Sequence, residues 1–197
     1  MHMPLPQAAL DQLFNTARTY NGYLDEPVTE AQLHAIWDLM KMGPTSVNML
    51  PARLVWCVSR ESKEKLAALS SGTNGPKIRA APVTVIIGMD IEFRQHLPEL
   101  FPHNPGVRDY FSDAHARETA AFRNSSLQGA YFIIAARALG LDTGPMSGFD
   151  NRAVDASFFK DTPHVRSNSI STLGYGDPAT VFGRSPRPEF GKFNRIE

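Results

Sequence analysis

The sequence predicts one α+β domain, and three of its features lead to this fold class. The 197 residues come close to the usual size of a single domain, and 42% of them are hydrophobic, which is enough for one sizeable core. Several segments repeat apolar residues at helical spacing, and short apolar runs with the length of buried strands lie between them. No internal repeat divides the chain, so we expect residues 1–197 to form a single unit.

Two amphipathic helices are expected first, because apolar residues recur at helical spacing over residues 10–17 and 33–40. Thr29 and Gln32 have the spacing of a capping box, which marks where the second helix begins. Gly43-Pro44 marks its end.

Three further helices are expected. Residues 62–69 form a short one, and residues 127–139 carry the longest apolar stripe, which predicts a central helix that Gly140 terminates. Another short helix is expected after Asp150.

Three short apolar, β-branched runs predict strands, at residues 54–58, 83–89 and 169–173. Residues 90–113 have no clean period and combine aromatic side chains with two histidines and three prolines. Because so long an irregular connection is usually functional, we interpret it as a lid-like insertion.

Composition excludes several classes of function. Lys and Arg balance Asp and Glu at 20 each, so no net charge draws the protein to nucleic acid. The longest apolar run, residues 83–89, is too short to span a bilayer, and no targeting segment is evident, so a cytoplasmic protein is expected. Cys57 is the single cysteine and excludes an internal disulfide, and six scattered histidines make a metal site improbable.

Standard catalytic motifs are absent from the sequence. It has no G-x-G-x-x-G, no Walker A loop and no nucleophile elbow. Polar clusters at the ends of predicted elements remain as candidates for a binding site.

Two of these clusters are basic. Arg18-Thr19-Tyr20-Asn21 follows the first helix, where an arginine and a hydroxyl suit a phosphate, although an arginine there also simply favours the helix dipole. Arg184 and Arg187 lie in a tail rich in helix breakers and are spaced to grip an anion.

The other three clusters have ordinary interpretations as turns. Pro44-Thr45-Ser46-Val47-Asn48 and Asn74-Gly75-Pro76-Lys77 contain residues that satisfy turns locally. Pro145-Met146-Ser147-Gly148 fits a loop, but its glycine also lets backbone N–H groups approach a planar ligand.

In this order, the five clusters resemble the nitroreductase family of FMN-dependent enzymes. The resemblance implies a central mixed, mainly antiparallel sheet flanked by helices and an intertwined homodimer with FMN between its subunits. It implies that Arg18, Thr19 and Asn21 hold the phosphate together with Arg184 and Arg187. Asn21 departs from the basic residue of the family motif.

The resemblance also assigns the remaining clusters. Pro44, Thr45, Ser46 and Asn48 are expected to pack on the partner subunit's flavin. Asn74 and Lys77 are expected at the pyrimidine edge, and Pro145, Met146, Ser147 and Gly148 near flavin N5. No catalytic side chain is assigned, since the flavin carries the hydride.

Three longer segments, residues 41–46, 121–126 and 140–150, are similar to the malonic semialdehyde reductases of the Rut pathway of pyrimidine degradation. This implies reduction of 3-oxopropanoate to 3-hydroxypropanoate with NADPH or NADH. Arg94, His103 and Arg108 of the insertion are candidates to bind the substrate carboxylate. A nitroaromatic, quinone or enone reductase and a flavin-binding protein without turnover are the alternatives.

Overall fold

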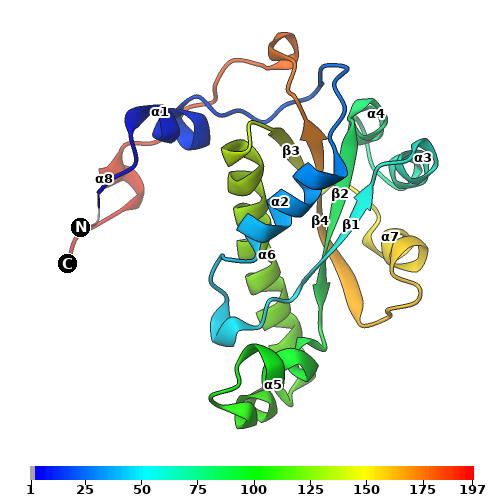
Figure 1. Cartoon of the computed structure of the whole chain (residues 1–197), viewed down its shortest axis with the longest axis vertical. Coiled ribbons are helices and arrows are strands. Elements are labelled where there is room, and N and C mark those ends of the chain that lie inside the picture. Colours follow the sequence, from blue (N-terminus) through cyan, green and yellow to red (C-terminus); the bar gives the residue numbers. More distant parts are fainter. Residues whose placement is uncertain (1–2) are drawn as a thin grey trace.

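The computed structural model describes residues 3–197 and shows a three-layer α+β arrangement (Figure 1). The middle layer is a sheet of β1 (Ala52–Cys57), β2 (Val83–Asp90), β3 (Asp142–Met146) and β4 (Val165–Gly174). Its order is β1-β2-β4-β3, and every neighbouring pair is antiparallel. A parallel bridge between Thr19 and Thr143 adds the N-terminal segment at the β3 edge, so the predicted mixed, mainly antiparallel sheet is confirmed.

Helices α2 (Glu30–Met40) and α6 (Ala114–Ala138) cover one face of this sheet (Figure 1). Alternate residues of β2, Val83, Val85 and Ile87, point to that face and pack with Ile36 of α2 and Phe132 of α6. Such alternation follows from the two-residue period of a strand. The largest apolar cluster therefore lies between the sheet and the central helix.

The opposite face carries α3 (Arg60–Ala68), α4 (Asn74–Ala80) and α7 (Asn151–Phe158). Ile86 of β2 and Ile170 of β4 pack there with Leu66, Ile78 and Val154, one from each of these helices. The sheet is thus buried on both sides, which explains why the β2 sequence is almost continuously apolar.

Cys57 lies fully buried in this second cluster, and burial raises the pKa of its thiol to about 11. Only the thiolate is a good nucleophile, so a thiol whose folded pKa lies above its ordinary value stays protonated near pH 8. We expect a disulfide reagent such as DTNB to leave the native protein unmodified and to release one equivalent of chromophore in denaturant. Fast release from the native protein would contradict this burial.

The predicted helix ends are confirmed where a cap was recognised. Thr29 and Gln32 form a complete capping box at the start of α2. Asp150 caps α7 by accepting a hydrogen bond from the Ala153 N–H at 3.1 Å. Gly140, with φ of +77°, follows α6 in the left-handed conformation that favours glycine.

The central helix is longer than the apolar stripe predicted. It begins at Asp113, whose carboxylate accepts from the Ala116 N–H at 2.7 Å. The middle of α6 buries polar side chains, Asn124, Ser125 and Gln128. Asn124 accepts from the Ser46 N–H and Gln128 from the Ala52 N–H, both at 2.8 Å. Apolar periodicity in the sequence does not reveal a helix face that is buried through polar side chains.

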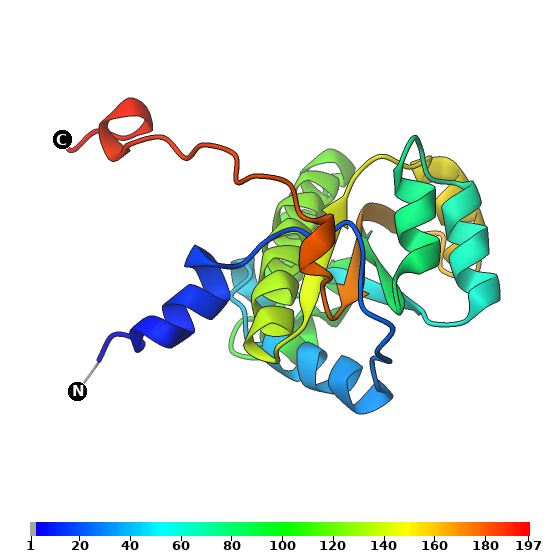
Figure 2. The same ribbon diagram turned by 90° about the horizontal axis from the view of Figure 1, so that it is seen from above.

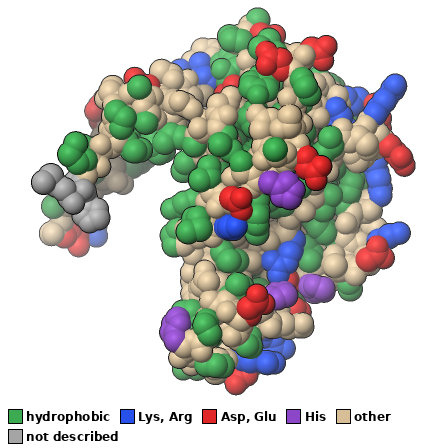
Figure 3. All heavy atoms as spheres, viewed as in Figure 1, with side chains coloured by type: hydrophobic (Ala, Val, Ile, Leu, Met, Phe, Trp, Pro, Cys, Tyr) green, Lys and Arg blue, Asp and Glu red, His purple; other side chains and the backbone are tan. Residues whose placement is uncertain are grey.

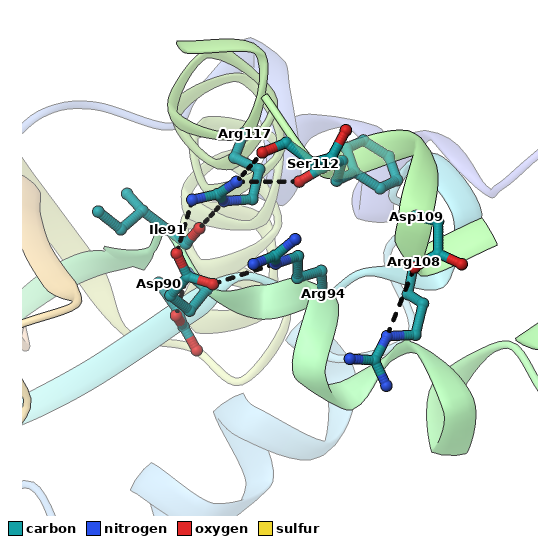
Figure 4. A network of polar contacts seen from close by, with 9 residues as sticks. Asp90, Ile91, Arg94, Arg108, Asp109, Ser112 and Arg117 are labelled. Carbon is teal, nitrogen blue, oxygen red and sulfur yellow. Dashed lines mark hydrogen bonds and ion pairs between the residues drawn. The ribbon is translucent and has the colours of Figure 1, made fainter. Parts of the chain in front are cut away.

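Residues 90–113 are folded into short helical pieces, η3 (Phe93–His96), α5 (Leu97–Leu100) and η4 (Pro105–Phe111). Their apolar residues build a third cluster around Phe93, Leu97 and Val107. Arg117 of α6 joins the two ends of the segment, as Figure 4 shows: it donates to the Ile91 and Ser112 carbonyls at 3.2 and 2.7 Å.

Two predictions of local structure were wrong. Asn74 and Lys77 belong to helix α4 and not to a surface turn, because Pro76 occupies the first turn, where a missing N–H costs nothing. Pro145 and Met146 belong to strand β3, which the sequence did not suggest. Proline is tolerated there because β3 is an edge strand.

Both chain ends extend from the body, as the view from above shows (Figure 2). The N-terminal part contains α1 (Gln7–Leu10) and a wider helical turn, η1 (Asp11–Asn15), in place of one regular helix. After η5 (Pro178–Thr180) the tail has no regular element until the single turn α8 (Phe190–Phe193), as its breakers predicted. Among the helices of residues 3–197, none has the length and apolar character needed to cross a membrane.

Candidate functional site

A cavity of about 320 Å³ lies where the two chain ends pass each other. It is lined by an N-terminal segment with Arg18, Thr19 and Asn21, by a C-terminal segment with Arg184 and Arg187, and by one residue of α6. The structure thus brings together the two basic clusters that the sequence analysis singled out. Four guanidinium groups line this cleft, which we call the arginine cleft.

Hydrogen bonds from side chains to backbone carbonyls join the two terminal segments across the arginine cleft. Arg18 Nη2 donates to the Phe182 carbonyl at 2.6 Å, and Arg184 Nη2 donates to the Ala17 carbonyl at 3.1 Å. Asn21 Nδ2 donates to the Thr180 carbonyl at 3.1 Å. The Asn21 amide therefore holds the tail in place, in a position where the family motif has a charge.

The N-terminal wall of the cleft rests on strand β3. The Tyr20 N–H donates to the Thr143 carbonyl at 3.1 Å, which sets Thr19 beside the strand. Gly144 makes this approach possible, since a Cβ at that position would lie 2.7 Å from the Tyr20 carbonyl oxygen. A side chain there would push the segment with Arg18 and Thr19 away.

The fourth arginine of the cleft, Arg137 in the last turn of α6, was not among the predicted site residues. Burial lowers the pKa of its guanidinium from the ordinary value; nearby Asp142 opposes this shift and Arg184 adds to it. Its Nε atom is buried without a hydrogen-bond partner among the described residues. A desolvated cation with a free donor is suited to an anionic ligand.

A second predicted pair also comes together. Asn74 Nδ2 and the Ser71 N–H both donate to the Gly148 carbonyl at 3.0 Å. A Cβ on Gly148 would lie 2.7 Å from Ser71 Oγ and 2.8 Å from Asn74 Nδ2, so only glycine fits this close approach. Lys77 lies one turn further along α4 and is partly exposed.

Strand β3 connects the two places. Thr143 near its start lies against the wall of the arginine cleft, and Met146 at its end leads into Ser147 and Gly148. Five residues in a strand extend about 16 Å. The arginine cleft and the Asn74–Gly148 contact are therefore separated by about the length of this strand.

The loop of Pro44, Thr45, Ser46 and Asn48 is not brought to the arginine cleft. The Ser46 N–H donates to Asn124, thirteen residues along α6 from Arg137, which corresponds to about 20 Å of helix. Val47 and Asn48 have φ of 46° and 52°, an unfavourable conformation for residues other than glycine. The surrounding contacts hold this loop in a defined shape, with Pro44, Ser46 and Asn48 exposed.

Arg94, His103 and Arg108, the candidates to bind a substrate carboxylate, differ in the contacts that they already make within the chain. Arg94 forms an ion pair with Glu92 at 3.2 Å, and the His103 ring lies 3.8 Å from that of Phe101. Arg108 has only Asp109 at 3.9 Å (Figure 4). Of the three, Arg108 is the most available to a ligand. Within residues 3–197, no group of three His, Cys, Asp or Glu side chains is placed to hold a metal ion.

Comparisons with known proteins find relatives that match over nearly the whole chain. A protein from a Caulobacter species with the provisional name NADH dehydrogenase/NAD(P)H nitroreductase is 56% identical over 192 residues, 98% of each chain. A Burkholderia lata protein with the same provisional name is 57% identical over 194 residues, 98% of each chain. This chain spans essentially the whole length of both relatives.

Solved structures share the fold at low identity. A nitroreductase-type protein of Exiguobacterium sibiricum, solved in complex with FMN, superposes with a TM-score of 0.85 at 17% identity, over 100% of this chain and 99% of its own. An enone reductase of gut-bacterial fatty acid metabolism gives 0.83 at 15% identity, over 98% and 99%. The family model described as "Nitroreductase family" matches residues 14–175, and the chain belongs to that family.

Proposed function

We propose that the protein is an FMN-dependent NAD(P)H oxidoreductase. The observation that carries this proposal is the arginine cleft, which gathers four guanidinium groups from three segments of the chain. The provisional NAD(P)H nitroreductase names of relatives at 53–57% identity support both the activity and the reductant. The FMN in the Exiguobacterium structure supports the cofactor.

The residues present fit FMN in three respects. The arginine cleft suits a phosphate, and the buried Nε of Arg137 leaves a desolvated cation whose cost a bound anion would offset. The glycine at position 148 admits Asn74 to its carbonyl and so places the Asn74 amide beside residues 146–148. These two places lie at opposite ends of β3, as a ligand with a phosphate at one end and a ring at the other requires.

Each group of residues then has a defined task. Arg18, Thr19, Arg184 and Arg187 would hold the phosphate, and Asn21 would fix the tail through the Thr180 carbonyl. Asn74 and Lys77 would orient the ring from α4, and Met146, Ser147 and Gly148 would offer backbone N–H groups beside them. Bound FMN supplies hydride transfer between the nicotinamide and the second substrate. The chain contributes binding, orientation and exclusion of water.

For the acceptor we propose malonic semialdehyde, on the similarity of residues 41–46, 121–126 and 140–150 to reductases of that aldehyde. Its carboxylate requires a cation, and Arg108 is the least engaged candidate in the insertion over residues 90–113, which would act as a lid. The relatives' names favour nitro compounds as the second candidate. The test is to reduce the protein and then measure its anaerobic reoxidation in four parallel reactions, with malonic semialdehyde, a nitroaromatic, a quinone or an enone.

The flavin absorbance near 450 nm reports each reaction. Fastest return with malonic semialdehyde supports the aldehyde, and fastest return with the nitroaromatic supports the second candidate. A protein that binds no FMN when purified or when FMN is added would overturn the proposal as a whole.

We further propose a homodimer, because one copy keeps the Pro44–Asn48 loop about 20 Å along α6 from the arginine cleft. A second copy that packs along α6 would carry this loop to the first copy's flavin. Leu127 and Tyr131, four residues apart on α6, are 47% and 37% exposed in a single copy. Figure 3 shows apolar side chains along the side of the body that faces the terminal segments. Obligate interfaces of this kind bury about 2,000 Å² or more.

The dimer can be tested with Leu127→Asp. A charge at the centre of an apolar interface must be desolvated on association, so we expect a monomer by light scattering and loss of tightly bound FMN. The matched control is Leu24→Asp, at a leucine that is 43% exposed and lies outside α6. A Leu127→Asp protein that remains dimeric would contradict an interface along α6.

A further inference from the structure

We propose that Arg137 is a phosphate ligand of the arginine cleft and supplies the charge that Asn21 lacks. This inference rests on the proposed function, since the phosphate is that of FMN. The Asn21 amide is neutral and is engaged with the Thr180 carbonyl. Arg137 lines the same cavity from the last turn of α6, at a position outside every predicted motif.

The contacts of Arg137 leave part of its guanidinium free for a ligand. Nη1 donates to the Leu13 carbonyl at 2.9 Å, which directs the side chain from the helix toward the N-terminal segment. Nε is buried and has no partner among the described residues. A buried donor without an acceptor costs about 1–3 kcal/mol, and an anion bound beside the guanidinium would offset part of this penalty.

The charges around Arg137 also favour an anion. Arg184 is close enough to destabilise the charged guanidinium, and burial acts in the same direction. Asp142 opposes both, but its carboxylate also accepts a hydrogen bond from the Gly176 N–H at 3.0 Å. An arginine keeps its proton even so, so that Arg137 and Arg184 repel each other in the same cleft. A dianion between them converts this repulsion into two attractions.

A purely structural role is the alternative. Arg137 stands in the last turn of α6, where a cation favours the helix dipole, and its contact with Leu13 holds the N-terminal segment. The two roles differ in their dependence on the phosphate. A structural arginine lowers the melting temperature of the flavin-free protein, whereas a phosphate ligand weakens FMN and leaves both that melting temperature and the affinity for riboflavin, which has no phosphate, unchanged.

The experiment compares FMN and riboflavin binding to the flavin-free protein by fluorescence titration. The variants are Arg137→Gln, Arg137→Lys and a matched control, Arg60→Gln, at an exposed arginine on the opposite face of the sheet. Removal of one charge-assisted hydrogen bond costs about 1.5–3 kcal/mol, so Arg137→Gln should weaken FMN about 10- to 150-fold. Riboflavin should change less than about twofold, and Arg137→Lys should fall between the wild type and Arg137→Gln because it keeps the charge and loses the fork.

Equal weakening of FMN and riboflavin, or no change in either, would overturn the role of Arg137. If Arg137→Gln does not fold, the ratio of the two dissociation constants in Arg137→Lys decides in the same way. Failure of the proposed function is a separate result, since the wild-type protein would then bind neither flavin.

Discussion

Replacement of Arg187 by alanine should lower the affinity for FMN by one to three orders of magnitude or more. Loss of one partner of a charge-assisted pair in a partly desolvated site costs about 2–5 kcal/mol, and about 1.4 kcal/mol corresponds to a factor of ten. In the structure Arg187 lines the arginine cleft and donates only to the Ser185 and Pro186 carbonyls of its own tail, at 3.1 and 3.2 Å. No carboxylate neutralises it in these contacts, so its charge is available to a ligand.

A flavin titration of Arg187→Ala beside its melting curve measures this effect. The tail contributes little to the core, so the melting temperature of the flavin-free variant should match that of the wild type, and activity should return with excess FMN. Lys192→Ala, which removes an exposed charge further along the same tail, is the control. An unchanged FMN dissociation constant in Arg187→Ala would remove Arg187 from the site.

Replacement of Phe132 by alanine should cost about 3–5 kcal/mol of folding free energy, because a fully buried ring leaves a cavity that its neighbours fill only in part. Phe132 stands at the centre of the cluster between α6 and the sheet, with its ring centroid 6.0 Å from that of Trp56. This loss is a large fraction of the stability of a typical domain.

Urea denaturation followed by circular dichroism measures this loss, at one fixed protein concentration because the proposed dimerisation would contribute to apparent stability. Tyr110→Ala, at a ring that is 77% exposed, is the control and should change the free energy by about 0.5 kcal/mol at most. A Phe132→Ala midpoint equal to that of the wild type would show that the ring does not support this core.

Local chemistry made most of the fold predictable from the sequence. Thr29, Asp150 and Gly140 act through their own backbone neighbours, so they marked the ends of helices correctly. Strand β3 was not predicted because Gly144 and Pro145 are usual in loops. Both are explained by tertiary contacts: Gly144 admits the Tyr20 segment, and Pro145 lies on an edge strand.

The candidate site was predictable to a smaller extent. Resemblance to a family pointed to Arg18, Arg184 and the Asn74–Gly148 pair, and the structure brings the first two into one cleft. Arg137 was not predicted because it stands between two alanines at the end of a regular helix, where an arginine ordinarily faces solvent. Its place in the cleft depends on the two terminal segments that pass the end of α6, and the periodicity of apolar residues does not show which segments pack there.

The arginine cleft joins segments from both ends of the chain, so its integrity depends on an intact C-terminal tail. Arg187 is synthesised only thirteen residues after the central strand β4 ends at Gly174, so the core and the walls of the cleft are completed close together in time. An anion bound in the cleft would stabilise the contacts of the tail with Ala17 and Arg18. By reciprocity, any contact that stabilises the tail would raise the affinity for the anion. Proteolytic trimming of the tail would therefore release the flavin while the core remains folded, and a loaded molecule would resist that trimming.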